Sequence, residues 1–164
     1  MKKTAIFFGS SMGNTEAVAE KIAKLMDADI FNVSDNPAGE LDNYENLIFG
    51  SSTWGIGDLQ DDWDGFISSL EDADLGGKTV AIFGLGDSDS YPDSFCDAVG
   101  TIYNAIENKG CNIVGSVSTD GYNYDATTAE KDGQLVGLLL DDDNESDKTD
   151  ARIEAWVSVL KAEM

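Results

Sequence analysis

Short apolar runs along the chain predict buried strands. They cover residues 4–8, 30–33, 47–49, 79–83 and 112–117. The first run places Ala5, Ile6, Phe7 and Phe8 in direct succession rather than at alternate positions. Continuous apolar stretches of this length are typical of strands that are buried on both faces of a parallel sheet. Gly50 follows the third run, and we expect it to close that strand.

The segments between these runs carry apolar residues at helical spacing. The spacing predicts helices over residues 15–26, about 61–70, 95–106 and 153–160. We expect Asn14 to cap the first helix and Gly110 to end the third as its C′ residue. Strands that alternate with helices predict an α/β protein, with a parallel sheet, helices on both of its faces and right-handed crossovers.

A polar stretch at residues 118–132 interrupts the last predicted strand. It contains Tyr122, Tyr124 and several turn-forming residues, and a further apolar run at residues 136–140 follows it. We interpret the stretch as an excursion that splits the fifth strand. A length of 164 residues suits one core, so we expect residues 1–164 to form a single domain.

The sequence is strongly acidic. Ten basic residues face 32 acidic ones, which gives a formal net charge of −22. Such a surface repels nucleic acid and anionic lipid and attracts a basic protein patch. In a second interpretation the acidity only keeps the protein soluble or reflects a salty habitat. The sequence contains no histidine, which removes the commonest general base and the commonest metal ligand.

Cysteine usage and hydropathy predict a cytoplasmic protein. We expect Cys96 and Cys111 to be free thiols, because a lone pair in a cytosolic chain is seldom a disulfide. No apolar run approaches the roughly 18 residues that cross a membrane. Met1, Lys2 and Lys3 resemble the start of a signal peptide, but polar residues soon interrupt the apolar stretch behind them and no small-residue cleavage site follows.

The loop after the first predicted strand has the features of a phosphate site. It reads Gly9-Ser10-Ser11-Met12-Gly13-Asn14-Thr15 and leads directly into a helix. The unpaired N–H groups and the dipole of a helix N-terminus favour an anion, and the loop contains no lysine or arginine. It lacks both the lysine of a nucleotide-triphosphatase P-loop and the glycine spacing of a dinucleotide-binding turn. The loop therefore fits a terminal monophosphate, with a simple turn as the alternative.

Two later loops each contain one large aromatic residue among small, flexible ones. Trp54 lies in the loop at residues 51–58, and Tyr91 lies in the loop at residues 84–92. Both loops follow predicted strands, so they lie at the same edge of the sheet as the phosphate loop. Taken singly, each aromatic side chain could cover a neighbouring helix. Together with the phosphate loop, they predict a flat ring held between two aromatic side chains.

These three loops together resemble those of the flavodoxin family. Residues 59–63 and 140–147 are similar to the long-chain type, and residues 118–132 match the insertion of that type. The resemblance implies a five-stranded parallel sheet in the order 2-1-3-4-5 and non-covalent binding of one FMN. It also implies a low-potential one-electron carrier that shuttles electrons between reductases and acceptor enzymes, cycling mainly between semiquinone and hydroquinone.

The resemblance further implies which residues contact FMN. They are Ser10, Ser11, Met12, Gly13, Asn14, Thr15, Ser52, Thr53, Trp54, Gly55, Ile56, Gly57, Leu85, Gly86, Asp87, Tyr91, Ser94, Phe95, Cys96 and Asp143. The residues expected to bind the phosphate are Ser10, Ser11, Gly13, Asn14 and Thr15. Trp54 would cover the inner face of the flavin and Tyr91 the outer face. Asp87 and Asp143 would contact the ribityl chain or the ring edge.

Three positions depart from the family pattern. Met12 replaces the usual threonine, which removes one hydroxyl donor but keeps the backbone N–H. Gly55 stands where long-chain relatives often carry asparagine. We expect it to let the carbonyl of the following peptide accept a hydrogen bond from the protonated flavin N5 and so favour the semiquinone, or else only to make room for the ring. Cys96 lies near the expected flavin edge, where its thiol is either reactive or buried and inert.

The acidic run at residues 141–147 does not match a calcium-binding loop. An EF-hand loop that starts at Asp141 needs glycine at its sixth position and glutamate at its twelfth, where this sequence has Ser146 and Arg152. We therefore expect no metal site. We interpret the run as a solvated approach to the last helix, with one carboxylate turned toward the cofactor.

The loops also allow three classes of function to be compared. A phospho-receiver domain would need acidic residues after the first and third strands and a lysine after the fifth, where the sequence has Ser10-Ser11, Ser51-Ser52 and Ser118-Thr119-Asp120. An FMN enzyme fed by NAD(P)H would need a second pocket with a positive group. A carrier without a substrate of its own fits best. Its expected partners are redox proteins with basic docking patches, namely flavodoxin- or ferredoxin-reductase-type donors and low-potential acceptors, and we expect a monomer.

Overall fold

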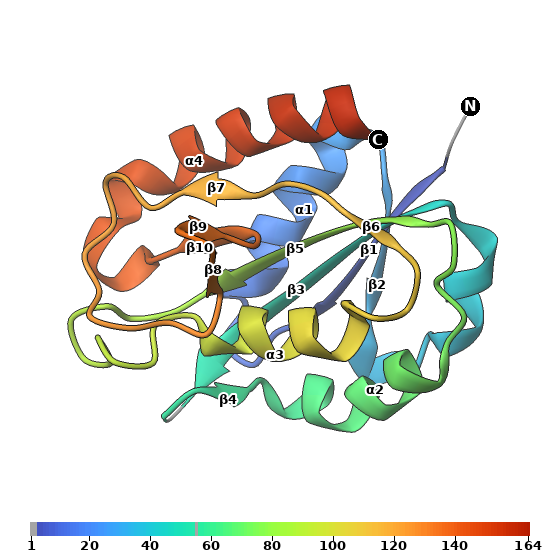
Figure 1. The fold of residues 1–164 in the computed structure, drawn as a ribbon, viewed down its shortest axis with the longest axis horizontal. Coiled ribbons are helices and arrows are strands. Elements are labelled where there is room, and N and C mark those ends of the chain that lie inside the picture. Colours follow the sequence, from blue (N-terminus) through green and yellow to red (C-terminus); the bar gives the residue numbers. More distant parts are fainter. Residues whose placement is uncertain (1–2, 55) are drawn as a thin grey trace.

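A parallel sheet forms the centre of the protein (Figure 1). The computed structural model describes residues 3–54 and 56–164. The main strands are β1 (Thr4–Gly9), β2 (Asp29–Asn32), β3 (Asn46–Trp54), β5 (Thr79–Leu85) and β10 (Leu138–Leu140). They lie side by side in the order β10–β5–β3–β1–β2, and these pairings are parallel. Numbered along the chain as the sequence predicted them, the strands have the order 2-1-3-4-5, which confirms the expected topology.

Helices cover both faces of this sheet, as predicted. Their bounds are α1 (Asn14–Met26), α2 (Asp61–Asp72), α3 (Asp97–Ile106) and α4 (Asp142–Glu163), with the short 3₁₀ segments η1 (Val33–Asp35) and η2 (Ala38–Asn43) between β2 and β3. α1 and α4 pack on one face, and α2 and α3 pack on the other (Figure 1). Successive residues of β1 serve both cores, because Phe7 packs with α2 and α3 while Phe8 packs with α1 and α4.

Strand β3 extends further than the sequence predicts. It does not end at Gly50 but continues to Trp54 and turns back into β4 (Asp58–Leu59), its antiparallel partner. Residues 51–54, predicted as loop, are therefore strand. Gly50 has a different role, since a Cβ atom at this position would lie 2.0 Å from Cζ of Phe83 on β5. The glycine lets that aromatic ring pack directly against β3.

The fifth strand is interrupted, as predicted. β6 (Asn112–Ile113) pairs with the start of β5, and β10 pairs with its end. Residues 114–137 leave the sheet between them, which is a wider excursion than residues 118–132. The excursion contains a small antiparallel sheet of β7 (Val117–Ser118), β9 (Gln134–Leu135) and β8 (Glu130–Lys131). The Tyr122 hydroxyl donates to the Leu139 carbonyl over 2.7 Å and so attaches the excursion to β10.

The helix ends differ from those predicted. Asn14 is the first residue of α1 rather than its cap, because Gly13 makes the turn into the helix with a φ of 89° and no side chain caps it. Phe95 lies in the turn before α3, where Cys96 holds the N-cap position with a φ of 51°. Gly110 has a φ of 78° but follows a further turn beyond α3, so it is not the C′ residue. No helix in the described ranges is long and apolar enough to cross a membrane.

Candidate functional site

A cavity of about 370 Å³ opens at the carboxyl ends of β1, β3 and β5. Its lining residues are Ser10, Ser11, Met12, Asn14, Thr15, Ser52, Thr53, Trp54, Leu85, Gly86, Asp87, Tyr91, Asp142 and Asp143. Small-molecule sites in proteins commonly occupy roughly 300–1,000 Å³, and doubly wound sheets bind ligands at this edge. The structure thus brings together around one cavity the three predicted loops and the start of α4, the segment of Asp143, which was also among the expected cofactor contacts.

Residues 10–15 form a tight turn ahead of α1. The Gly13 N–H donates to Ser10 Oγ over 3.0 Å, and the Gly13 carbonyl accepts the N–H of Ala17 over 3.0 Å. The first N–H groups of α1 have no partner within the helix, and the helix dipole adds partial positive charge at this end. Among the described residues that line the cavity none is lysine or arginine. An anion here would be held by amides and hydroxyls.

A buried glutamine, which the sequence analysis did not single out, holds this loop by a hydrogen bond. Gln60 is the N-cap of α2, and its Oε1 accepts the N–H groups of Asp62 and Trp63 over 3.0 and 3.3 Å. Its Nε2 donates to Ser11 Oγ over 3.0 Å. Gly9 makes room for it, since a Cβ atom there would lie 2.2 Å from Gln60 Oε1. Glutamine is not a favoured N-cap residue, so no capping signal marks the position.

Two aromatic side chains line the cavity while remaining partly open to solvent. Trp54 is 42% exposed and Tyr91 is 44% exposed. The Trp54 indole N–H donates to Ser52 Oγ over 2.8 Å, and the neighbouring Thr53 Oγ1 accepts the N–H of Ala98 at the start of α3 over 3.1 Å. The cavity lining therefore includes two large aromatic side chains on separate segments of the chain. Whether they enclose a flat ring stays a prediction.

Asp87 is held at the cavity wall by three donors. Its Oδ1 accepts the N–H groups of Ser90 and Asp89 over 3.0 and 3.2 Å and the side-chain amide of Asn144 over 2.8 Å. These bonds, the Ser90 N–H first, favour the ionised form and lower the pKa of Asp87 against the opposing effect of burial. Asp87 is therefore a fixed negative charge at this wall.

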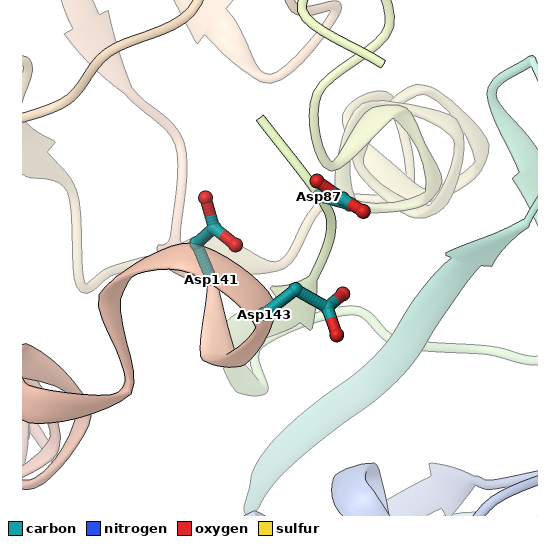
Figure 2. Close-up of side chains that lie close together, drawn as sticks. All are labelled: Asp87, Asp141 and Asp143. Atoms are coloured by element: carbon teal, nitrogen blue, oxygen red, sulfur yellow. The ribbon is translucent and has the colours of Figure 1, made fainter. Parts of the chain in front are cut away.

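The start of α4 is more buried than the sequence predicts. Asp141 is fully buried, and its carboxylate accepts the Ser88 N–H over 3.2 Å, the Ser88 hydroxyl and the Asn144 N–H. Interpreting this run as solvated is wrong for Asp141, because these donors replace water. Oxygens of Asp87, Asp141 and Asp143 lie within 4.8 Å of one another (Figure 2). Partial burial, followed by the charges of its acidic neighbours, raises the pKa of Asp143.

Asp142 lines the cavity although the sequence did not single it out. Its carboxylate accepts the Thr149 hydroxyl seven residues further along α4. The signal was present in the acidic run at residues 141–147, but the run does not reveal which of its carboxylates reach the cavity. The structure assigns the buried position to Asp141 and the cavity wall to Asp142 and Asp143.

Several predicted residues do not reach the cavity wall. Gly13 shapes the turn without lining the cavity, and Gly57, with a φ of 87°, and Ile56, which is 86% exposed, lie beyond it. Gly55 lies outside the described residues. Ser94, Phe95 and Cys96 are buried instead of lining the cavity.

The chain turns inward at Cys96 because Gly86 leaves space for it. A Cβ atom on Gly86 would lie 2.9 Å from the Cys96 backbone nitrogen and 3.0 Å from its sulfur. The Cys96 thiol faces the Leu140 carbonyl at 3.7 Å, and burial raises the pKa of this thiol well above its usual value. Of the two possibilities for Cys96, the structure has the buried thiol. Cys111 is also unpaired, as predicted.

The fold and the cavity define a class of protein: a doubly wound α/β protein that binds a ligand where the order of its strands reverses. Comparison with known families then places the chain more closely. The family model described as Flavodoxin matches residues 6–156, and the chain belongs to the flavodoxin family. The interrupted fifth strand agrees with the long-chain type.

Individual relatives agree with this assignment. A flavodoxin of Nostoc sp. is 46% identical over 165 residues, covering 99% of this chain and 97% of its own. Flavodoxin 1 of Azotobacter vinelandii is 42% identical over 170 residues, covering 99% and 98%. The crystal structure of Fusobacterium nucleatum flavodoxin bound to flavin mononucleotide superposes with a TM-score of 0.95 at 33% identity and covers 100% of this chain and 99% of that one.

Proposed function

We propose that this protein binds one FMN non-covalently in the cavity and works as a low-potential one-electron carrier with no substrate of its own. The observation that carries the proposal is the convergence of an amide-rich helix start and two exposed aromatic side chains on one cavity. The Fusobacterium nucleatum relative, described as bound to flavin mononucleotide, supports it. When bound, FMN supplies one-electron redox chemistry, which the side chains of this protein lack.

The loop at residues 10–15 would hold the phosphate. Its serine and threonine hydroxyls and the free N–H groups at the start of α1 suit a terminal dianion. Met12 contributes its N–H only. FAD carries a second phosphate and an adenosine, and the described cavity wall offers no basic side chain to either. We therefore expect clear selectivity for FMN over FAD.

The aromatic and acidic residues would bind the rest of the cofactor. Trp54 would cover the inner face of the flavin and Tyr91 the outer face, while Asp87 and Asp143 contact the ribityl chain or the ring edge. The carboxylates at the wall oppose added negative charge on the reduced ring, so the second electron is harder to add than the first. Cycling mainly between the semiquinone and the hydroquinone is the mode of use that such a separation favours.

The partners would be redox proteins with basic docking patches. A net charge of −22 steers encounter with a positive surface over roughly 10 Å at 0.1 M salt. Reductase-type donors and low-potential acceptors meet this description, whereas nucleic acid and anionic membranes do not. Electron transfer to such a partner is expected to slow as salt rises. A rate that stays constant between low and high ionic strength would assign the acidity to solubility alone.

We also propose that the chain is a cytoplasmic monomer in which residues 1–164 form one domain. The unpaired thiols of Cys96 and Cys111 agree with a reducing compartment. Cell fractionation tests the location, and sedimentation of the purified protein tests the oligomeric state. A disulfide-linked or membrane-associated form would contradict this part of the proposal.

The central experiment is a cofactor test. The purified protein is expected to be yellow, to contain one FMN per chain, and to quench the fluorescence of added FMN after the cofactor is removed. FAD serves as the matched control and is expected to bind poorly. A colourless protein that leaves FMN fluorescence unchanged would overturn the proposal. Oxidation of NADPH without a partner reductase would instead identify an enzyme with its own substrate.

A further inference from the structure

The helix that brings Asp142 and Asp143 to the cavity is broken one turn after it begins. Glu145 lies inside α4 but has a φ of −132° and a ψ of 39°, which are not helical values. The first turn of α4 is therefore not a rigid extension of the long helix behind it. Its direction depends on what holds Glu145 in place.

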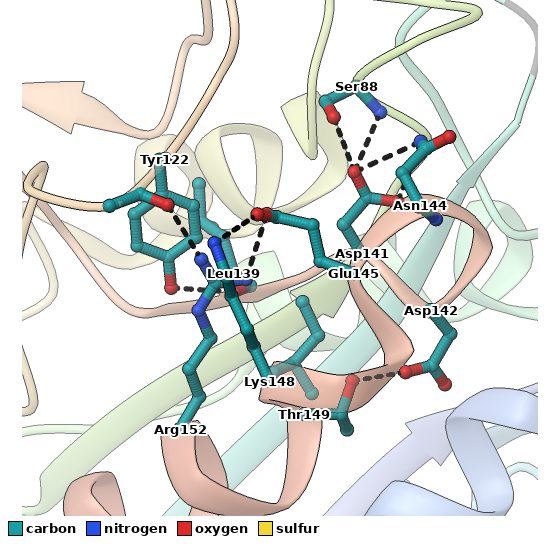
Figure 3. A network of polar contacts seen from close by, with 12 residues as sticks. Ser88, Tyr122, Leu139, Asp141, Asp142, Asn144, Glu145, Lys148, Thr149 and Arg152 are labelled. Atoms are coloured by element: carbon teal, nitrogen blue, oxygen red, sulfur yellow. Dashed lines mark hydrogen bonds and ion pairs between the residues drawn. The ribbon is translucent and has the colours of Figure 1, made fainter.

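Two cations hold Glu145. Lys148 Nζ lies 2.7 Å from its Oε2, and Arg152 Nη1 lies 3.2 Å from its Oε1 (Figure 3). The Lys148 side chain is 46% exposed, whereas that of Arg152 is 14% exposed. Solvent and salt screen the exposed pair more strongly, and a lysine in water also keeps more freedom to move. Arg152 is thus the better-fixed of the two partners.

Arg152 also contacts the excursion at residues 114–137. Its Cζ lies 4.0 Å from the centroid of the Tyr122 ring, and its Nη2 donates to the Gly121 carbonyl over 3.0 Å. Tyr122 is in turn bonded to the Leu139 carbonyl of β10. Arg152 is the only arginine in the sequence. A planar guanidinium can lie flat on a ring while its fixed fork of N–H groups bonds oxygens at its edge, and an ammonium group lacks this combination.

The kink connects to the cavity through Asn144. The Glu145 N–H donates to the Asp141 carbonyl over 2.7 Å, which closes the first turn. The Asn144 amide, one residue before the kink, donates to Asp87 over 2.8 Å and to Asp141 over 3.0 Å. A continuous chain of contacts thus leads from Tyr122 through Arg152 and the kink at Glu145 to Asn144, and from there to the carboxylate of Asp87. Figure 3 shows this chain as far as Asn144.

We propose that Arg152 is a positioning residue for the FMN pocket, acting through Glu145 on the turn that carries Asp142 and Asp143. The inference rests on the FMN binding proposed above. Arg152 is not among the residues that line the cavity, so it acts on the cofactor only through others. The long-chain excursion thereby becomes part of the support of the pocket, since it supplies the ring and the carbonyl that fix the guanidinium.

The test replaces Arg152 by lysine, which keeps the positive charge but loses the planar guanidinium that stacks on Tyr122. The dissociation constant of FMN is expected to rise between about twofold and thirtyfold, the range over which residues outside a site modulate it. The potential of the second electron, measured at saturating FMN, is expected to rise as the carboxylates of the turn move away from the ring. Lys148→Met is the matched control, because it removes the exposed partner of the same carboxylate, and should change affinity less than about twofold.

A double-mutant cycle separates positioning from a general loss of stability. In an Asn144→Ala background the turn has already lost its bond to Asp87, so Arg152→Lys should cost clearly less affinity than in the parent. Equal costs in the two backgrounds, within the error of the affinity measurement, would show independent action and overturn the proposal. So would an Arg152→Lys protein with unchanged affinity and potential. If Arg152→Lys does not fold, Glu145→Gln takes its place in the same cycle. A parent protein that binds no FMN would contradict the proposed function instead.

Discussion

Two parts of the cavity wall are built in different ways. The loop wall, residues 10–15, is one continuous stretch whose shape comes from Gly13 and from the start of α1. The joined wall consists of residues 85–91 and 141–144. Its two segments meet through the bonds from Ser88 to Asp141, 53 positions apart, and from Asn144 to Asp87, 57 positions apart.

The difference teaches where binding and stability are coupled. In the loop wall Ser11, Met12 and Asn14 are exposed, Ser10 is half-buried and Thr15 is buried, so changes at most of these positions act chiefly on a ligand. In the joined wall the Asp141 carboxylate is buried among its donors, so its removal also disturbs the fold.

Asp141→Ala should be the most damaging change. It leaves the Ser88 and Asn144 donors unpaired in a buried place, and it removes the N-cap of α4. The free energy of unfolding, measured in urea on the FMN-free protein, is expected to fall by about 2–4 kcal/mol. Asp89→Ala, an exposed change nearby, is the control and should cost less than about 0.5 kcal/mol. A loss for Asp141→Ala no larger than this control would remove the contrast between the walls.

The aromatic side chains should affect binding more than stability. Trp54→Ala and Tyr91→Ala are each expected to weaken FMN binding by about 1–3 kcal/mol, through lost stacking and lost apolar contact. Because both side chains are more than two-fifths exposed, the unfolding free energy of the FMN-free protein should change little. Trp54→Phe and Tyr91→Phe keep a ring and should retain most of the affinity. Unchanged affinity in both alanine variants would mean that the aromatic side chains do not touch the cofactor.

Ser10→Ala tests the loop wall itself. The hydroxyl accepts the Gly13 N–H at an exposed position, so its removal is expected to leave stability almost unchanged. FMN binding should weaken by about 0.5–1.5 kcal/mol, the usual net value of one hydrogen bond. Titration with riboflavin, which lacks the phosphate, is the control and should show no difference between Ser10→Ala and the parent. An equal loss for both ligands would move the effect away from the phosphate.

Sequence reasoning predicted the parts of the molecule whose signals are local. The helices on both faces, the break in the fifth strand and the loops around the cavity follow from runs and spacings within short windows, whereas the order of the strands was implied only by the family resemblance. Gly50 was misinterpreted because a glycine after an apolar run usually ends a strand. Its actual neighbour, Phe83, lies on another strand, and no window around Gly50 contains it.

In the functional site, too, features with a local signal were predicted and features that depend on distant residues were not. The loop wall and the two aromatic side chains could be found from the sequence, whereas the support of each wall could not. Gln60 contacts Ser11 across 49 positions, and Asp141 is buried only because Ser88 meets it. An acidic residue in a run of acidic residues predicts solvent exposure. Its burial depends on donors that arrive from elsewhere in the chain.

The smallest expected effect is a difference in pKa between Asp87 and Asp143, two carboxylates of the joined wall. Hydrogen bonds, with the Ser90 N–H first, lower the pKa of Asp87 from its usual 3.8, while burial and then neighbouring charge raise that of Asp143. A carboxyl whose pKa is lowered by folding stabilises the fold at pH values above its unfolded pKa. This contribution is lost as the pH falls through the folded pKa. A carboxyl whose pKa is raised by folding destabilises the fold while it is ionised, and protonation removes this cost.

Acidification from neutral pH should therefore protonate Asp143 first, which relieves repulsion at the wall, and Asp87 only below 3.8, which loosens it. A carbon-13 NMR titration of the FMN-free protein is expected to show this order directly. Asn144→Ala removes one donor from Asp87 and should raise its pKa, but by less than losing the Ser90 N–H would, since that donor is the larger cause. If Asp87 titrates above Asp143, the hydrogen bonds that Asp87 accepts, from Ser90 in its own segment and from Asn144 across the joined wall, do not hold in solution.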